Sequence, residues 1–331
     1  MQSSMAKKRE RNAFNSRLID NVAKYFKENL GILAGFALMC GVLSVLSPAF
    51  MTKDNILNIL RQITTNANLA FGMTLVIIIC GIDLSIGSIL ALSGTLAAGL
   101  ITNNHLPVPA AVLIGIIVGT SVGFFNGVTI STTGIPPFIV TLATMQIARG
   151  MAYVYTNGMP VRTLNASFNS IGNGYLGPIP LPVIYTTIIF ILMSILLNKT
   201  QFGRHLYAVG GNKNAAKFSG ISIKKIEIAT FTLSGLLAAI SGVVICARMY
   251  SGQPTVGQGF EMDAIAAAVL GGTSFSGGIG KLGGTLIGVF VIGVLNNGLN
   301  LLNVNSFWQL IAKGTVILLA VYVDMMKKKK K

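Results

Sequence analysis

Apolar stretches of about 20 residues recur along most of the chain and constrain its fold more than any other feature. A helix needs roughly 20 predominantly apolar residues to cross a bilayer, and we expect about ten spans of that kind. Their approximate limits are 30–47, 62–80, 86–102, 108–130, 136–156, 181–197, 226–248, 261–277, 282–302 and 307–324. The composition agrees, because 52% of the residues are hydrophobic and only 10% are charged. We therefore predict an all-α fold, a polytopic transmembrane helical bundle.

Lysine and arginine orient the predicted bundle, because 18 of the 25 lie in three segments. Seven precede the first span, six lie within 198–225 and five form the terminal run 327–331. Basic loops remain in the cytoplasm, and the even numbers of spans between the segments put all three on that side. The predicted organisation is a basic cytoplasmic N-terminal arm (1–29), a transmembrane domain (30–324) that contains a cytoplasmic loop (198–225), and a cytoplasmic lysine tail (325–331). The net charge of +16 thus reflects topology and attraction to anionic membrane lipid, rather than nucleic-acid binding.

Two glycine-rich stretches, 190 residues apart, resemble each other. "GIDLSIGSILALSGTL" (81–96) and "GGTSFSGGIGKLGGTL" (271–286) match at their first and seventh residues and through a final Gly-Thr-Leu. Paired, glycine-interrupted segments in corresponding halves of a transporter indicate broken helices around a central path. We predict an internal parallel repeat with a helix break in each copy.

Asp83 lies in the first of these breaks, where an ionised carboxylate is costly and usually has a role. One hypothesis is an ion relay. The favoured one is structural: the carboxylate accepts the free N–H groups at the start of span 86–102, where the helix dipole also favours a negative charge.

Small and polar residues recur on single faces of several spans. Glycines four residues apart allow another backbone to approach closely, and they occur at Gly115, Gly119, Gly123 and Gly127, and again at Gly280, Gly284 and Gly288. Polar stripes occur in the second span (Asn58, Gln62, Thr65, Asn68) and the ninth (Gly293, Asn296, Asn300, Asn303). These amides either join helices or line a wet path.

Signals for catalysis, metal binding and nucleotide binding are weak. The three cysteines lie in apolar stretches without metal-ligand spacing, and the two histidines have no visible acid or nucleophile partner. Residues 278–283 fit G-x-G-x-x-G, but no strand–helix unit surrounds them. We predict no catalytic residues, no metal site and no cofactor in this chain. Ionisable residues within spans are few, and of these Lys313 is expected to extend its amine toward the membrane surface.

The loop 198–225 contains a predicted short helix. Asn212 is a good N-cap, Lys213 to Ser219 can form two helical turns, and Gly220 suits the left-handed residue that ends them. A short cytoplasmic helix outside the spans is a plausible docking element for a soluble motor protein.

These stretches together resemble the permease subunit of bacterial ABC importers of the monosaccharide (ribose) type, within the group that includes branched-chain amino acid permeases. The resemblance is carried by "NLAFGMTLVIIICGIDLSIGSILALSG" (68–94), "VYTNGMPV" (154–161), "GRHLYAVGGNKNAAKFSGI" (203–221), "QPTVGQGFEMDAIAAAVLGGTSFSGGIGKLGGTLIG" (253–288) and "NNGLNLL" (296–302). It extends from about Pro48 to Asp324.

The resemblance implies a partner set and a location. The partners are a second permease copy in a homodimer, a cytoplasmic ATPase that binds ATP and magnesium, and an extracellular or periplasmic sugar-binding protein that delivers a monosaccharide. The implied location is the bacterial cytoplasmic (inner) membrane, with many spans and both termini inside. The residues implied to contact the ATPase are Arg204, Gly210, Gly211, Asn212, Ala215, Ala216 and Gly220.

Neutral amides and hydroxyls suit a path for a hydroxylated solute, because they form hydrogen bonds weak enough to release it. The candidate path residues are Asn66, Asp83, Ser85, Ser88, Asn126, Ser274, Asn296, Asn297 and Asn300. The alternatives are a branched-chain amino acid permease of the same kind, a passive channel or secondary carrier for small polar solutes, and, more remotely, a membrane enzyme. Which sugar is carried does not follow from the sequence.

Overall fold

The computed structural model describes residues 30–329, so the N-terminal arm and the last two lysines lie outside the described residues. The chain divides into two compact units, Met1–Ser47 and Pro48–Lys331. The described part of the first unit contains one helix, α2 (Leu30–Leu46). All later elements belong to the second unit.

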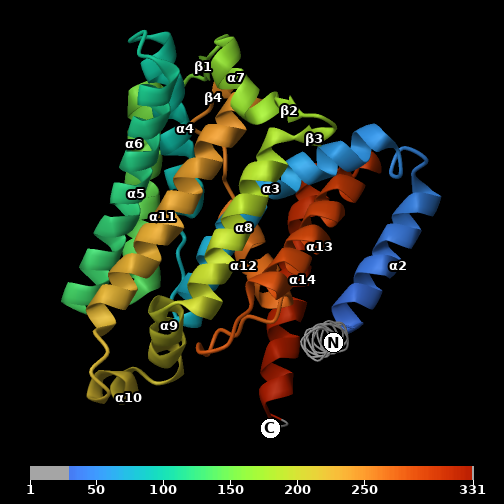
Figure 1. The fold of residues 1–331 in the computed structure, drawn as a ribbon. Coiled ribbons are helices and arrows are strands. Elements are labelled where there is room, and N and C mark those ends of the chain that lie inside the picture. Colours follow the sequence, from blue (N-terminus) through green and yellow to red (C-terminus); the bar gives the residue numbers. More distant parts are fainter. Residues whose placement is uncertain (1–29, 330–331) are drawn as a thin grey trace, which may run out of the picture. The chain divides into compact units, whose positions relative to one another are not determined.

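The second unit consists of helices joined by short connections and four two-residue strands (Figure 1). Its elements are α3 (Lys53–Ile78), α4 (Ile86–Thr102), α5 (Val108–Thr133), α6 (Pro137–Thr156), β1 (Val161–Arg162), α7 (Ala166–Asn173), β2 (Tyr175–Leu176), β3 (Ile179–Pro180), α8 (Leu181–Lys199), α9 (Gln201–Gly211), α10 (Lys213–Phe218), α11 (Ile223–Arg248), β4 (Ser251–Gly252), α12 (Phe260–Leu270), α13 (Leu282–Leu301) and α14 (Ser306–Lys329).

Each of the ten predicted spans corresponds to a helix, and the all-α prediction is confirmed. The largest errors lie in the second span, where α3 begins at Lys53 rather than at residue 62, and in the eighth span, which was predicted to reach residue 277. Helix α12 ends at Leu270 because the chain turns at Gly272, whose φ of +86° is a left-handed conformation that favours glycine. The tenth helix is also longer than predicted, since α14 continues to Lys329 and includes most of the lysine tail.

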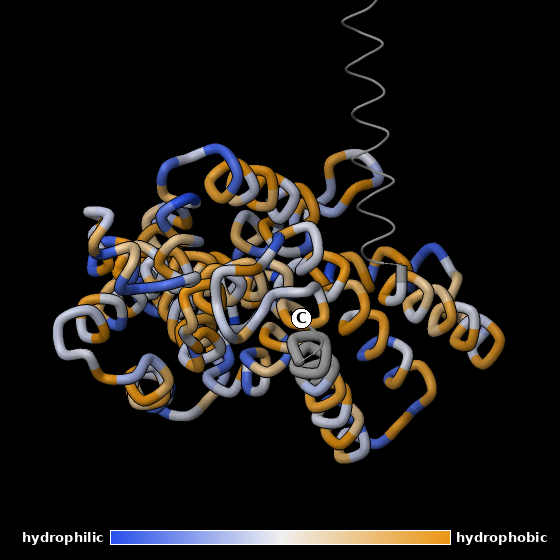
Figure 2. The backbone as a smooth tube through the Cα atoms, turned by 90° about the horizontal axis from the view of Figure 1, so that it is seen from below, coloured by the Kyte–Doolittle hydropathy of each residue, from blue (hydrophilic) through white to orange (hydrophobic). Residues whose placement is uncertain are grey.

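Within the described residues, four helices are long and apolar enough to cross a membrane by length and composition: α5, α8, α11 and α13. Helices α2 and α4 are apolar but shorter. Most of the hydrophobic colour in Figure 2 lies along the helices, and much of the hydrophilic colour lies in the segments between them. A chain with several such helices is a multi-pass membrane protein.

Glycines bring the helices into close contact, as predicted from their spacing. A Cβ added at Gly123 of α5 would lie 2.9 Å from the Gly235 Cα of α11, and one at Gly115 would lie 2.8 Å from the Ser93 carbonyl oxygen of α4. In α13, Gly288 faces the backbone of Ala267 in α12. Close backbone approach of this kind is the main source of helix association where lipid provides no hydrophobic drive.

The two ends of the second unit differ in structure. One end carries β1 and β4, which pair antiparallel with Val161 opposite Gly252, together with α7 and the β2–β3 hairpin. The opposite end carries α9 and α10 (Figure 1). The segments 157–181 and 250–260 are therefore joined by the β1–β4 pairing, and the predicted cytoplasmic loop 198–225 lies at the other end of the bundle.

Candidate functional site

A polar cavity of about 140 Å³ lies among five helices near the end of the bundle that carries β4. It is large enough for several water molecules or one small polyol. The two polar stripes predicted from sequence meet here, one from α3 and the other from α13. The amide and hydroxyl side chains in its wall are Gln62, Thr65, Asn66, Asn296, Asn300 and Gln309.

Charged residues form part of the cavity wall and hold one amide in a fixed orientation. The buried carboxylate of Asp263 accepts hydrogen bonds from Lys313 Nζ at 3.0 Å and from Asn296 Nδ2 at 3.2 Å. Lys313 therefore forms an internal ion pair, and the expectation that it extends to the membrane surface is wrong. The NH₂ group of Asn296 donates to Asp263, whereas its Oδ1 has no hydrogen-bond partner, and neither has Thr65 Oγ1. Arg248 completes this side of the wall.

Asp83 lies apart from this cavity and is fully buried in a hydrogen-bonded network. Its Oδ1 accepts from the Ser85 N–H at 3.0 Å and the Ser85 hydroxyl at 2.5 Å, and its Oδ2 accepts from the Ser234 hydroxyl of α11 at 2.8 Å. The network continues from Ser85 to Asn126 of α5 and from there to Thr144 of α6. The predicted contact with a free N–H group at the start of α4 is thus present, and the network as a whole joins the start of α4 to α5, α6 and α11.

The nine candidate path residues do not form one surface. Asn66, Asn296 and Asn300 line the cavity, whereas Asp83, Ser85 and Asn126 belong to the buried network. The three others lie elsewhere: Asn297 exchanges two hydrogen bonds with Asn55, Ser88 is buried without a partner for its hydroxyl, and Ser274 lies between α12 and α13.

Both predicted helix breaks are present, and they touch each other. The chain leaves helical geometry between α3 and α4 and again between α12 and α13. The Gly278 N–H donates to the Ile78 carbonyl at 2.8 Å, which joins the second break to the end of α3. Helix α3 also packs against α12 and α13. The buried hydroxyls of Thr74 in α3 and Thr285 in α13 lie 2.7 Å apart.

The C-terminal end of α9 packs closely against the place where the two breaks meet. A Cβ added at Gly210 would meet the Ile78 carbonyl on one side and lie 2.7 Å from the Gly278 nitrogen on the other. The Tyr207 hydroxyl donates to the Gly280 carbonyl at 2.7 Å, and burial raises the pKa of this phenol above its ordinary value. Helix α9 therefore contacts both breaks directly.

Helix α10 has the predicted capping geometry. The Asn212 side chain accepts from the Ala215 N–H at 3.0 Å, and Gly220 has a φ of +81°. Among the residues implied to contact the ATPase, Gly210 and Ala216 are buried, whereas Arg204, Gly211, Asn212, Ala215 and Gly220 are exposed. The exposed members thus surround α10 and the buried ones attach it to the bundle.

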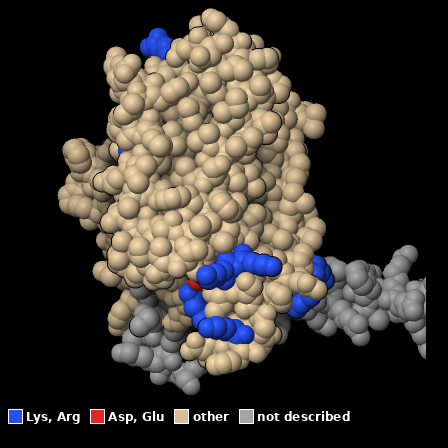
Figure 3. All heavy atoms as spheres, turned by 90° about the vertical axis from the view of Figure 1, so that its left-hand side faces the viewer, with Lys and Arg blue, Asp and Glu red and all other residues tan. Residues whose placement is uncertain are grey.

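An aromatic side chain and several lysines give α10 the character of a docking surface. Phe218 is 90% exposed at the C-terminal end of α10. Lys213 binds Glu227 of α11 at 2.8 Å and ties the start of α10 to the bundle. Basic side chains gather at this end of the molecule in the space-filling view (Figure 3).

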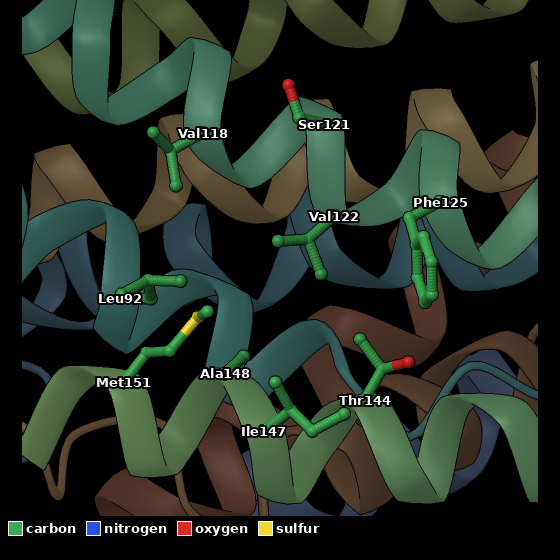
Figure 4. Close-up of a pocket in the computed structure, with 9 residues that line it drawn as sticks. All are labelled: Leu92, Val118, Ser121, Val122, Phe125, Thr144, Ile147, Ala148 and Met151. Atoms are coloured by element: carbon green, nitrogen blue, oxygen red, sulfur yellow. The ribbon is translucent and has the colours of Figure 1, made fainter.

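A second hollow, of about 400 Å³, lies between α4, α5 and α6 and has mainly apolar walls (Figure 4). Its two hydroxyl groups are occupied, because Ser121 donates to Ile117 and Thr144 donates to Asn126. A hydroxylated solute would find few partners there, so this hollow does not fit a polar path.

Sequence reasoning missed the Asp263–Lys313 pair, Ser234, Tyr207 and Phe218. The pair could have been suspected from opposite charges within two neighbouring spans. The other three carry no local sequence signal, since their significance depends on what the fold brings beside them. Within the described residues, no group of three or more His, Cys, Asp or Glu side chains is arranged to hold a metal ion.

A bundle of broken helices, with a polar cavity toward one end and a short capped helix outside the bundle at the other, defines a membrane transport protein. Comparison with known proteins agrees: the family model "Branched-chain amino acid transport system / permease component" matches residues 55–321. The chain belongs to this permease family.

Several curated relatives cover nearly the whole chain. The ribose import permease protein of Bacillus subtilis (strain 168) is 49% identical over 302 residues, 91% of this chain and 94% of that protein. The D-allose transport system permease protein of Escherichia coli (strain K12) is 39% identical over 300 residues, 90% of this chain and 92% of that protein. The xylose transport system permease protein of Haemophilus influenzae is 36% identical, and the match covers 85% of this chain and 92% of that protein. No solved structure gives a significant match.

Proposed function

We propose that this chain is the permease subunit of an ABC importer that carries a monosaccharide, with ribose as the first candidate, across the bacterial cytoplasmic membrane. Relatives that match about nine tenths of the chain are named as ribose, D-allose and L-arabinose permeases, which supports a sugar over a branched-chain amino acid. ATP hydrolysis is supplied by a separate cytoplasmic ATPase, and an external binding protein delivers the sugar. Two permease copies form the transmembrane part.

The observation that carries the mechanism is the contact of α9 with both helix breaks. A motor that binds the exposed surface of α10 would push or pull α9, and α9 contacts the end of α3 and the break just before α13 through Gly210 and Tyr207. Because packed interfaces switch between discrete arrangements rather than deform continuously, a small shift at α9 can change the tilt of both broken helices. The bundle then opens alternately toward the two sides.

Phe218 is the proposed anchor for the ATPase. Binding energy at protein interfaces is concentrated in a few residues, and aromatic side chains that enter a partner's pocket are prominent among them. The surrounding lysines would orient an acidic rim on the ATPase. The exposed Gly211 and Ala215 lie on the same short segment.

Translocation is proposed to use the polar residues of the central bundle. Asn66, Asn296 and Asn300 provide the wet part of this path, and the Asp83 network keeps α4, α5, α6 and α11 aligned beside it. The chain itself needs no cofactor for this role, because ATP and magnesium bind to the separate ATPase subunit.

The test is uptake of radiolabelled D-ribose by vesicles that contain the permease, its ATPase and its binding protein, with D-allose, D-xylose and L-leucine as competitors. We expect uptake that requires ATP, stops with a hydrolysis-deficient ATPase and is not inhibited by L-leucine. Uptake that continues unchanged with the deficient ATPase would favour a passive or secondary carrier instead.

Docking is tested separately by co-purification of the ATPase. Phe218→Ala and Ala215→Trp should release the ATPase while the permease remains folded. Leu319→Ala, which removes an exposed apolar side chain on α14, is the matched control for Phe218→Ala. Normal ATPase recovery with both docking variants would refute the assignment of α10.

A further inference from the structure

We infer that the cavity between α3 and α13 is a transient binding site for a single monosaccharide, in which Thr65 and Asn296 contact its hydroxyl groups. This inference rests on the proposed function and adds to it the position and the contacts of the sugar within the permease.

The first support is the pair of unsatisfied polar atoms in the cavity region. Thr65 is 3% exposed and Asn296 is 6% exposed, and both line the cavity. Neither Thr65 Oγ1 nor Asn296 Oδ1 has a hydrogen-bond partner. Buried polar atoms without partners are rare and costly, which indicates that a solute or water supplies the missing bonds.

The second support is that the unpaired carbonyl of Asn296 is held in place. Its NH₂ group donates to Asp263, and Asp263 is fixed in turn by Lys313. This arrangement leaves Oδ1 as a fixed acceptor, while the Thr65 hydroxyl is able to donate and to accept. A sugar hydroxyl has the same dual capacity and can satisfy both atoms.

The third support is the chemistry of the remaining wall. Gln62 and Asn66 on α3 add amides, and Phe260 of α12 adds an aromatic ring that can pack against the C–H groups of a sugar. A binding site for a small molecule typically combines apolar surface with a few well-placed polar groups. The Asp263–Lys313 pair is internally neutralised, and the guanidinium of Arg248, whose Nη1 donates to the Arg61 carbonyl, has further N–H donors that can bind sugar hydroxyls.

The position of the cavity gives the site a place in the transport sequence. Arg248, the last residue of α11 before β4, belongs to its wall, so the site lies toward the end opposite α9 and α10. A sugar released by the binding protein at that end would pause there. Such a pause keeps the sugar in the permease until the bundle opens toward the cytoplasm.

The experiment measures D-ribose uptake and ATP hydrolysis together in vesicles that contain the complete importer. Thr65→Val removes the hydroxyl at nearly constant volume, and we expect about two- to tenfold fewer sugar molecules imported per ATP hydrolysed, the loss associated with one hydrogen bond. Thr65→Ser restores the hydroxyl and should restore the ratio. The matched control is Thr187→Val on α8, whose exposed hydroxyl bonds only to its own helix at Val183 and whose loss should change nothing.

A second variant keeps the test decisive if Thr65→Val fails to assemble. Gln62 is only half-buried, so Gln62→Leu should assemble normally and lower the same ratio. Wild-type ratios in Thr65→Val and Gln62→Leu would overturn the binding site and leave the importer function intact. If the wild-type complex imports none of the three sugars in an ATP-dependent manner, the proposed function itself is wrong.

Discussion

Replacement of Gly210 by alanine should separate α9 from the two helix breaks. The added Cβ would meet the Ile78 carbonyl and lie 2.7 Å from the Gly278 nitrogen, and both are backbone atoms that cannot rotate away. Overpacking of this kind costs about 1–3 kcal/mol. If the Gly278–Ile78 hydrogen bond is also lost, about 0.5–1.5 kcal/mol is added. We expect a total destabilisation of roughly 1.5–4.5 kcal/mol, concentrated at this junction.

The neighbouring glycine provides the control. No atom lies within 4 Å of a Cβ added at Gly211, so Gly211→Ala should be neutral, or stabilising by up to about 1 kcal/mol through helix propensity. The assay compares thermal unfolding of the purified complexes with the number of sugars imported per ATP. Gly210→Ala should unfold at lower temperature and hydrolyse ATP without proportionate import. If it matches Gly211→Ala in thermal unfolding and the wild-type complex in sugars imported per ATP, α9 does not transmit motion through this contact.

Three further changes test the other polar contacts. Asp83→Asn should have little effect on stability because it retains an acceptor and the shape of the side chain, whereas Asp83→Leu should cost about 3 kcal/mol or more by leaving several donors unpaired. Loss of transport in a correctly inserted Asn variant would show that the charge itself is functional. Tyr207→Phe should cost about 0.5–1.5 kcal/mol at neutral pH. Because burial raises the folded-state pKa above 10.0, this difference should persist to about pH 10 and shrink as pH rises further, and a difference independent of pH up to 11 in thermal unfolding would contradict the reasoning. Lys313→Met should destabilise more than the double variant Asp263→Asn/Lys313→Met, because the single change leaves a buried carboxylate unpaired; equal unfolding temperatures would argue against a structural ion pair.

The sequence by itself determined the number and type of the main elements. Long apolar runs admit only helices in lipid, because every backbone polar group must be paired within the segment. The glycine-rich repeat located both breaks, and the capping residues Asn212 and Gly220 located α10 within one residue at its C-terminal end. These features are local, so the order of residues is sufficient to identify them.

Only the tertiary structure decided which polar residues act together. The nine candidate path residues are all polar and cannot be told apart by sequence, yet in the fold Asn66 and Asn296 line a cavity whereas Asp83 belongs to a buried network. The partner of Asp263 is 50 residues away, at Lys313, and Gly210 contacts Ile78 and Gly278, which are 132 and 68 residues away in the chain. Such pairings depend on helix rotation and packing over the whole bundle, and no local pattern in the chain specifies them.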